Sequence, residues 1–149
     1  MTQPVTASVH ATCVALRHGR IWRAVLLRGP SGAGKSDLAL RLIEAGARLV
    51  ADDRTTLVRA RDAVIARAPA PIAGLLEVRG LGIRRLPRSH LLAQARVVLL
   101  VDLVPPAEVE RLPEPAHETL LGVDLPVLEL ASFEASSCAK LRLAVAMRL

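Results

Sequence analysis

Aromatic residues are almost absent from this chain, which has one tryptophan, one phenylalanine and no tyrosine among its 149 residues. Trp22 and Phe133 are too few to form the stacking platforms on which single-stranded nucleic acids usually bind. Lysine is scarce as well, so the net charge of +6 comes almost entirely from arginine, and no run of basic residues stands out. We therefore expect no nucleic-acid partner, while the basic excess favours a phosphate-bearing ligand or an acidic partner.

Cysteines and long apolar runs are also rare. Cys13 and Cys138 form no Cys-x-x-Cys pair, and two cysteines in a chain of this length indicate a reducing compartment rather than a disulfide framework. The segment Met1–His10 has neither the basic nor the apolar region of a signal peptide. The longest apolar stretch, Val97–Val104, is interrupted by Asp102 and is too short to cross a bilayer. We expect a cytoplasmic protein without a membrane partner.

A complete phosphate-binding motif is present. Residues 29–36 fit the pattern Gly-x-x-x-x-Gly-Lys-Ser. The glycines let the backbone approach a polyphosphate, and the helix that follows directs free N–H groups at the phosphate oxygens. Lys35 would contact the β- and γ-phosphates, and Ser36 would ligate Mg²⁺. The predicted nucleotide-binding residues are Gly29, Pro30, Ser31, Gly32, Ala33, Gly34, Lys35 and Ser36.

The residues on either side of the motif provide the context that such a loop needs. Ile21–Leu27 has the composition of a buried strand, and Lys35–Ala45 spaces its leucines along one apolar face of a helix that Gly46 ends. A glycine-rich turn that binds nothing is the alternative. A strand, a glycine-rich loop and a helix in this order predict nucleotide binding.

Strands dominate the rest of the chain. We expect one domain over residues 1–149, of the α/β class but richer in strands than the kinases that alternate strands and helices. The other expected elements are strands at Val9–Leu16, Arg48–Ala51, Thr55–Arg59, Ala63–Arg67, Arg96–Val101 and Val127–Leu130, and helices at Ser89–Ala95 and Phe133–Met147.

Carboxylates in several segments are candidates for the chemistry of a bound Mg-nucleotide. Asp52 and Asp53 end the strand after the loop helix, where adjacent carboxylates can divide metal-binding and base duties; a solvated turn is the alternative. Glu77 and Arg79 share one side of an extended segment, either as metal ligand and phosphate clamp or as a half-exposed strand edge. Asp102 also ends a buried strand, but the prolines after it favour a structural role.

Three segments taken together resemble one family. Residues 29–36, 48–53 and 76–83 are similar to the catalytic domain of HPr kinase/phosphorylase, and the last segment, Leu-Glu-Val-Arg-Gly-Leu-Gly-Ile, matches that family's signature almost residue for residue. The resemblance covers residues 9–130. It implies a kinase that uses ATP and Mg²⁺ to phosphorylate a serine of HPr, the phosphocarrier protein of the bacterial phosphotransferase system. It also implies a fold similar to the nucleotide domain of phosphoenolpyruvate carboxykinase, and a homo-oligomer, which in that family is a hexamer.

The resemblance also implies roles for particular residues. Asp53 would be the general base, and Glu77 would be the metal ligand beside Ser36. His10 would be the counterpart of an active-site histidine that precedes the loop in that family. Arg111 would correspond to an arginine that acts on the transferred phosphate.

Departures from the family pattern narrow the expected activity. Larger members carry an additional N-terminal domain, which we do not expect here, so the chain resembles the short form of some Gram-negative bacteria. They also carry a Pro-Gly-Arg-Asn stretch linked to the reverse, phosphate-consuming reaction, whereas Leu130–Ala135 contains no arginine, and we expect little phosphorolysis. The alternatives are a small-molecule kinase, for which a lid insertion and an aromatic pocket are missing, and an ATP-sensing regulator, which would need fewer acidic residues.

Overall fold

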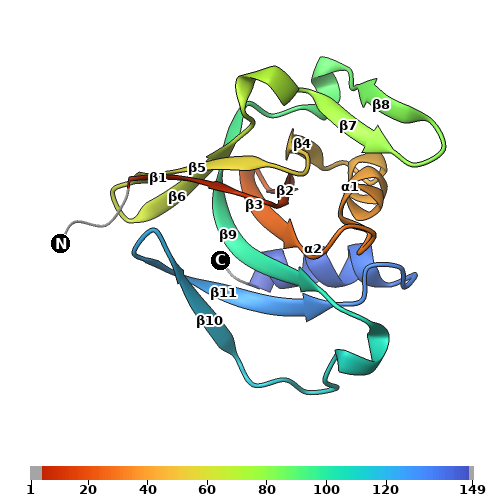
Figure 1. The fold of residues 1–149 in the computed structure, drawn as a ribbon. Coiled ribbons are helices and arrows are strands. Elements are labelled where there is room, and N and C mark those ends of the chain that lie inside the picture. Colours follow the sequence, from red (N-terminus) through yellow and green to blue (C-terminus); the bar gives the residue numbers. More distant parts are fainter. Residues whose placement is uncertain (1–4, 148–149) are drawn as a thin grey trace.

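The computed structural model describes residues 5–147 and is built around one large sheet (Figure 1). The strands of this sheet are β1 (Thr6–Val9), β2 (Thr12–His18), β3 (Ile21–Arg28), β4 (Arg48–Ala51), β5 (Thr55–Ala60), β6 (Ala63–Arg67), β9 (Gln94–Leu103), β10 (Ala116–Leu120) and β11 (Val123–Leu130). A separate two-stranded sheet consists of β7 (Leu75–Val78) and β8 (Gly82–Arg85). The helices are α1 (Lys35–Glu44) and α2 (Ser137–Met147), and 3₁₀ turns lie at Ala70–Ile72, Arg88–His90 and Pro106–Glu108.

The strand directions decide where a site can form. β9 pairs in parallel with β3 and β11 and antiparallel with β6. β2 pairs antiparallel with both β3 and β4, so β4 runs in the same direction as β3. The strands β3, β4, β9 and β11 therefore end at the same edge of the sheet, where ligands bind in open α/β folds. The segments that follow these strand ends form the site described below.

Apolar cores cover both faces of the sheet, because side chains of a strand alternate between its faces. One core lies between the sheet and the two helices, and the other lies on the opposite face with β5, β6, β10 and β11. In β3, Val25 and Leu27 belong to the helix-side core, whereas Ala24 and Leu26 belong to the other. Leu38 of α1 is fully buried in the helix-side core, and burial of such a side chain contributes about 2 kcal/mol. This packing fixes α1 behind the glycine-rich loop.

Most of the elements predicted from the sequence are confirmed. The structure contains a strand-rich α/β fold, with the loop helix, the strand Arg48–Ala51 and the hairpin of β5 and β6 where they were expected. β3 and β9 are each longer at their carboxyl ends than predicted, so that Arg28 and Leu103 still belong to strands.

The helix predicted at Ser89–Ala95 is wrong. Only the single 3₁₀ turn Arg88–His90 forms there, and β9 follows it. Between the two, Leu91 forms a parallel bridge with Leu49 of β4, and the Leu92 N–H donates to the Leu49 carbonyl at 3.0 Å. Pairing with the edge of β4 therefore outweighs the helical spacing of the leucines.

Two other predictions need correction, and one strand was missed. The strand expected at Val9–Leu16 is divided into β1 and β2 by a bend at His10. The last helix begins at Ser137 rather than at Phe133, because residues 133–136 form turns that pack beside the loop. β10 was not predicted, and it pairs with β11 through a tight turn in which Gly122 has a φ of +81°.

Candidate active site

The glycine-rich loop joins β3 to α1, as the motif predicts. Gly34, at the N-terminus of α1, has a φ of +95°, which only glycine adopts without strain. A Cβ on Gly34 would lie 2.6 Å from Ser132 Oγ and 2.8 Å from Phe133 Cζ, so a larger residue would displace these side chains as well as strain the backbone. Lys35 is buried, and its Nζ donates to the Gly29 carbonyl at 2.6 Å and to the Pro30 carbonyl at 3.1 Å. The lysine side chain is thus held along the inside of the loop.

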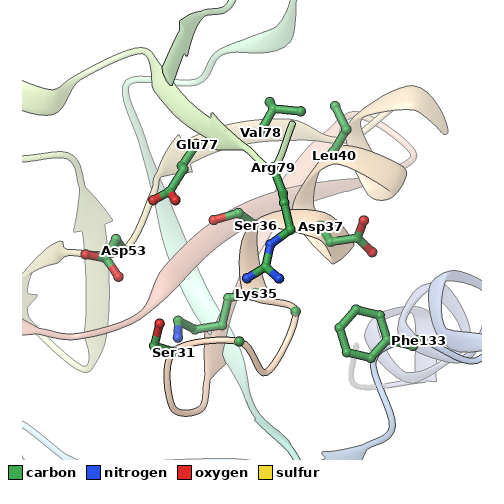
Figure 2. A pocket seen from close by; sticks show the side chains of 12 residues that line it. Ser31, Lys35, Ser36, Asp37, Leu40, Asp53, Glu77, Val78, Arg79 and Phe133 are labelled. Carbon is green, nitrogen blue, oxygen red and sulfur yellow. The ribbon is translucent and has the colours of Figure 1, made fainter. Parts of the chain in front are cut away.

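A cavity of about 300 Å³ lies against this loop and brings together residues from distant parts of the chain (Figure 2). The functional side chains predicted from the sequence that line it are those of Ser31, Lys35, Ser36, Asp53, Glu77 and Arg79. Asp37, Leu40, Val78 and Phe133 also line it and were not predicted as site residues. The loop, the turn after β4 and the end of β7 therefore face one space.

Asp52 lies next to the cavity and holds residues that line it. It is only 7% exposed, and it does not line the cavity. Its Oδ1 accepts hydrogen bonds from Ser36 Oγ at 2.7 Å and from Thr12 Oγ1 at 3.0 Å, and its Oδ2 accepts one from the Glu77 N–H at 2.9 Å. One buried carboxylate thus connects the loop, β2 and β7, and it is placed to orient Ser36 and Glu77.

Asp53, by contrast, points its carboxylate into the cavity. Its φ of +63° is uncommon for a residue with a side chain, and the Asp53 N–H donates to Thr12 Oγ1 at 3.1 Å. The carboxylate is 66% exposed and accepts a hydrogen bond from His10 Nε2 at 2.7 Å. The bend between β1 and β2 therefore brings His10, the expected counterpart of an active-site histidine, to Asp53.

Thr12 was missed by the sequence reasoning. It is fully buried and forms hydrogen bonds with both Asp52 and Asp53. A threonine in a strand is ordinary, so nothing in the sequence distinguishes this one from a packing residue.

Asp102 forms an ion pair away from the cavity. Arg28 Nε donates to Asp102 Oδ1 at 2.8 Å, and the same guanidinium donates to Glu118 Oε2 at 2.6 Å from Nη1. The hydrogen bond from Arg28 lowers the pKa of Glu118, and the bond to Glu118 raises the pKa of Arg28. These contacts support the structural role predicted for Asp102.

Arg111 lies outside the cavity. It is exposed, in the bend that follows the 3₁₀ turn Pro106–Glu108, and does not line the cavity. Its contribution to the site therefore stays a prediction. His18, at the end of β2, is also exposed, as expected for a residue beside the turn.

The oxygen-bearing side chains that line the cavity suit a metal ion that is held partly by phosphates. Within residues 5–147, no group of three or more histidine, cysteine, aspartate and glutamate side chains is arranged to hold a metal ion. Ser36 and Glu77 nevertheless line the same cavity, and Mg²⁺ commonly takes only one or two protein oxygens, with water and phosphate oxygens completing its shell. The residues present therefore fit an Mg-nucleotide better than a metal bound by the protein alone.

The fold and the site define a strand-rich α/β domain in which a glycine-rich loop, a lysine and several carboxylates surround one cavity. Comparison with known proteins places it further: the chain belongs to the HPr serine kinase C-terminal domain family, whose model matches residues 5–149. This finding confirms the resemblance inferred from the three sequence segments.

Individual relatives agree with this assignment. The chain is 39% identical over 101 residues to the HPr kinase/phosphorylase of Peptoclostridium acidaminophilum, covering 67% of this chain and 32% of that protein. It is 40% identical over 117 residues to the HPr kinase/phosphorylase of Leptothrix cholodnii, covering 72% and 36%. The chain thus matches about a third of the length of these curated relatives.

A solved structure extends the likeness to the whole fold. The Hpr(Ser) kinase/phosphatase from Coxiella burnetii superposes with a TM-score of 0.80 at 25% identity, and the match covers 95% of each chain. In the part of the chain that the structure describes, no helix is both long enough and apolar enough to cross a membrane.

Proposed function

We propose that this protein is an ATP- and Mg²⁺-dependent serine kinase that phosphorylates the phosphocarrier protein HPr. The observation that carries the proposal is the single cavity shared by Lys35 and Ser36 of the loop with the carboxylates of Asp53 and Glu77. Membership of the HPr serine kinase family supports both the reaction and the acceptor.

The loop would bind the nucleotide through its phosphates. Its backbone N–H groups and the N-terminus of α1 attract the phosphate oxygens, and the glycines of the loop let the backbone approach them. Lys35 would exchange its carbonyl partners for the β- and γ-phosphates, where its charge stabilises the transferring group. Arg79, which lines the same cavity, would add a second positive charge.

Ser36 and Glu77 would hold Mg²⁺, which, when bound, neutralises phosphate charge. Asp52 supports this role because it fixes both the Ser36 hydroxyl and the backbone of Glu77. Its burial and its several hydrogen bonds favour positioning these ligands over accepting a proton from the substrate.

Asp53 would accept the proton of the substrate serine hydroxyl. Its exposed carboxylate faces the cavity, so a protein side chain can reach it. The hydrogen bond from His10 would hold this carboxylate in place while the hydroxyl oxygen attacks the γ-phosphate. The reaction breaks the bond between the γ-phosphorus and the bridging oxygen and forms the phosphoserine ester, leaving ADP.

Several finer expectations belong to the same proposal. They are weak phosphorolysis, a fold similar to the nucleotide domain of phosphoenolpyruvate carboxykinase, one phosphate-loop catalytic domain over residues 1–149, a homo-oligomer and a cytoplasmic location. The absence of arginine from Leu130–Ala135 supports the first of these. A role for Arg111 in transfer would require its loop to approach the cavity.

Incubation with labelled ATP, Mg²⁺ and HPr tests the proposal. We expect label to appear on one serine of HPr, and to be lost with Lys35→Ala enzyme and with HPr that carries alanine at that serine. ATP binding without transfer to HPr would instead favour the ATP-sensing regulator. Label transferred only to small molecules of a cell extract would favour the small-molecule kinase.

A further inference from the structure

Phe133 occupies the end of the cavity that lies opposite the carboxylates of Asp53 and Glu77. Figure 2 shows its ring beside the loop, with Lys35 between the ring and the side chains of Asp53 and Glu77. The ring is close to the loop backbone, since a Cβ on Gly34 would lie 2.8 Å from Phe133 Cζ and 3.0 Å from Cε1. The cavity therefore has Asp53 and Glu77 at one end and the ring of Phe133 at the other, where Asp37 also lines it.

The backbone that carries Phe133 is anchored, although its side chain is not covered. Ser132 Oγ donates to the Ala33 carbonyl at 2.5 Å, and Arg41 donates to the Ser132 carbonyl. Ser137 Oγ donates to the Ala131 carbonyl at 2.6 Å. Phe133 itself is 69% exposed. A large apolar ring is thus held beside the loop with much of its surface free.

Trp22, the other aromatic residue of the chain, has a different environment. The guanidinium of Arg48 lies 4.8 Å from the centre of its ring and that of Arg17 lies 5.8 Å from it. Trp22 is therefore already covered by cation–π partners, whereas no such contact forms to Phe133 within the described residues.

The positions of Asp53, Glu77 and Phe133 predict how a nucleotide would lie along the cavity. A nucleoside triphosphate on the loop would place its γ-phosphate near Asp53 and Glu77, the proposed base and metal ligand. The nucleoside would then extend toward the opposite end of the cavity. A second, mostly apolar hollow of about 440 Å³ continues past Phe133, between the loop and the residues Leu103–Pro106.

We propose that Phe133 is a nucleobase-stacking residue, which binds the base of the nucleotide whose phosphates the loop holds. This inference rests on the proposed function, since it requires a nucleotide on the loop. An exposed ring with an anchored backbone loses little conformational freedom when a base stacks on it. Stacking of one base on an aromatic side chain changes affinity by about tenfold or more.

Binding of ATP and of inorganic tripolyphosphate to the same variants tests the proposal. We expect Phe133→Ala to weaken ATP binding by about tenfold and to leave tripolyphosphate binding unchanged, because tripolyphosphate has no base. Leu143→Ala is the matched control, since Leu143 is a similarly exposed apolar residue on α2 and does not line either hollow. This control should bind both ligands like the wild type.

A spectroscopic variant reports stacking directly. In the double variant Trp22→Phe, Phe133→Trp, the only tryptophan is the one at the proposed site. ATP should quench its fluorescence, and tripolyphosphate at saturating concentration should not.

Several outcomes would overturn the proposal. If Phe133→Ala lost ATP and tripolyphosphate affinity equally, the ring would serve to shape the loop. Unchanged ATP affinity in Phe133→Ala would contradict stacking directly. An increased KM for the protein acceptor with unchanged ATP affinity would assign the ring to substrate docking instead. Wild-type protein that binds neither ligand would overturn the proposed function itself, and with it this inference.

Discussion

Two groups of carboxylates lie at the edge where the parallel strands end, and they have different environments. Asp52 and Asp53 follow β4 and lie near Glu77, whereas Asp102 lies near the end of β9 and is joined by Glu118 of β10. Arg28 donates to both members of the second group, and no cation is paired with Glu77 or Asp52 among the described residues. The availability of a carboxylate for metal or substrate is decided by its neighbours rather than by its position at a strand end.

The first group is itself divided. Asp52 is buried and uses both carboxylate oxygens to hold other parts of the site, while Asp53 is exposed and has His10 as its side-chain partner. Adjacent residues point in different directions here because Asp53 adopts a positive φ. The turn thus separates a positioning acid from an acid that a substrate can reach.

The largest expected difference between the groups is in phosphoryl transfer. Asp53→Asn should lower the rate by about 100-fold or more while ATP still binds, because the amide keeps the shape of the side chain but cannot accept the proton. Asp102→Asn should retain the rate within a few-fold. Single-turnover transfer to HPr measures both variants. A greater loss in Asp102→Asn would reverse the assignment of the two groups.

The effect of removing Arg28, the cation that pairs with the second group only, should come next in size. Arg28→Met eliminates the hydrogen bonds to Asp102 and Glu118 and leaves these carboxylates facing each other. We expect a loss of about 2 kcal/mol in the free energy of unfolding, which for a domain of this size lowers Tm by about 4–8 °C. Denaturant and thermal unfolding measure the effect. Arg54→Met, at an exposed position without a side-chain partner in the described structure, is the control and should unfold like the wild type.

The Mg²⁺ dependence of transfer should change when a carboxylate of the first group is replaced, and should not change for the second group. Glu77→Gln should raise the Mg²⁺ concentration for half-maximal transfer on the order of tenfold, because a neutral amide is a poorer ligand for a hard cation than a carboxylate. Glu118→Gln makes the same chemical change in the other group and should leave the Mg²⁺ dependence unchanged. Transfer rates at varied Mg²⁺ and fixed ATP decide the matter, and identical curves for both variants would return Glu77 to a structural role.

Much of the first group's position could be predicted from residues that are close together in the sequence. The glycine-rich loop and the strand Arg48–Ala51 have clear boundaries, since glycine or aspartate residues stand beside them. The Asp52–Asp53 pair could be placed beside the loop because a short strand after the loop helix returns the chain to the same edge. These features depend on residues close together in the chain.

What the sequence did not reveal depends on contacts between distant residues. β10 has only Gly122 as a turn signal and pairs with a strand that contains Pro126, a residue that usually argues against a strand. Thr12 acquires its role only when β2 and the turn after β4 meet. The scarcity of aromatic residues was counted against base stacking and an aromatic pocket was not expected, yet the turns after β11 bring Phe133 to the loop.

The smallest expected effect is the pH dependence of the stability that the Arg28–Glu118 pair contributes. The hydrogen bond from Arg28 lowers the pKa of Glu118 in the folded protein below the value of about 4.3 expected in the unfolded chain. The stabilisation by this pair should therefore be fully present above that unfolded value and should be lost as the pH falls through the lower folded value. Because Glu118 is 42% exposed, solvent screening limits the effect to less than about 1 kcal/mol.

Comparison of wild type with Glu118→Gln isolates this contribution from the other carboxylate that faces Arg28. The difference between their free energies of unfolding should be largest near neutral pH and should shrink toward zero in acid. Denaturant unfolding at several pH values between about 3 and 7 measures the difference. If it stays constant over that range, Glu118 contributes through packing, and only Asp102 neutralises Arg28.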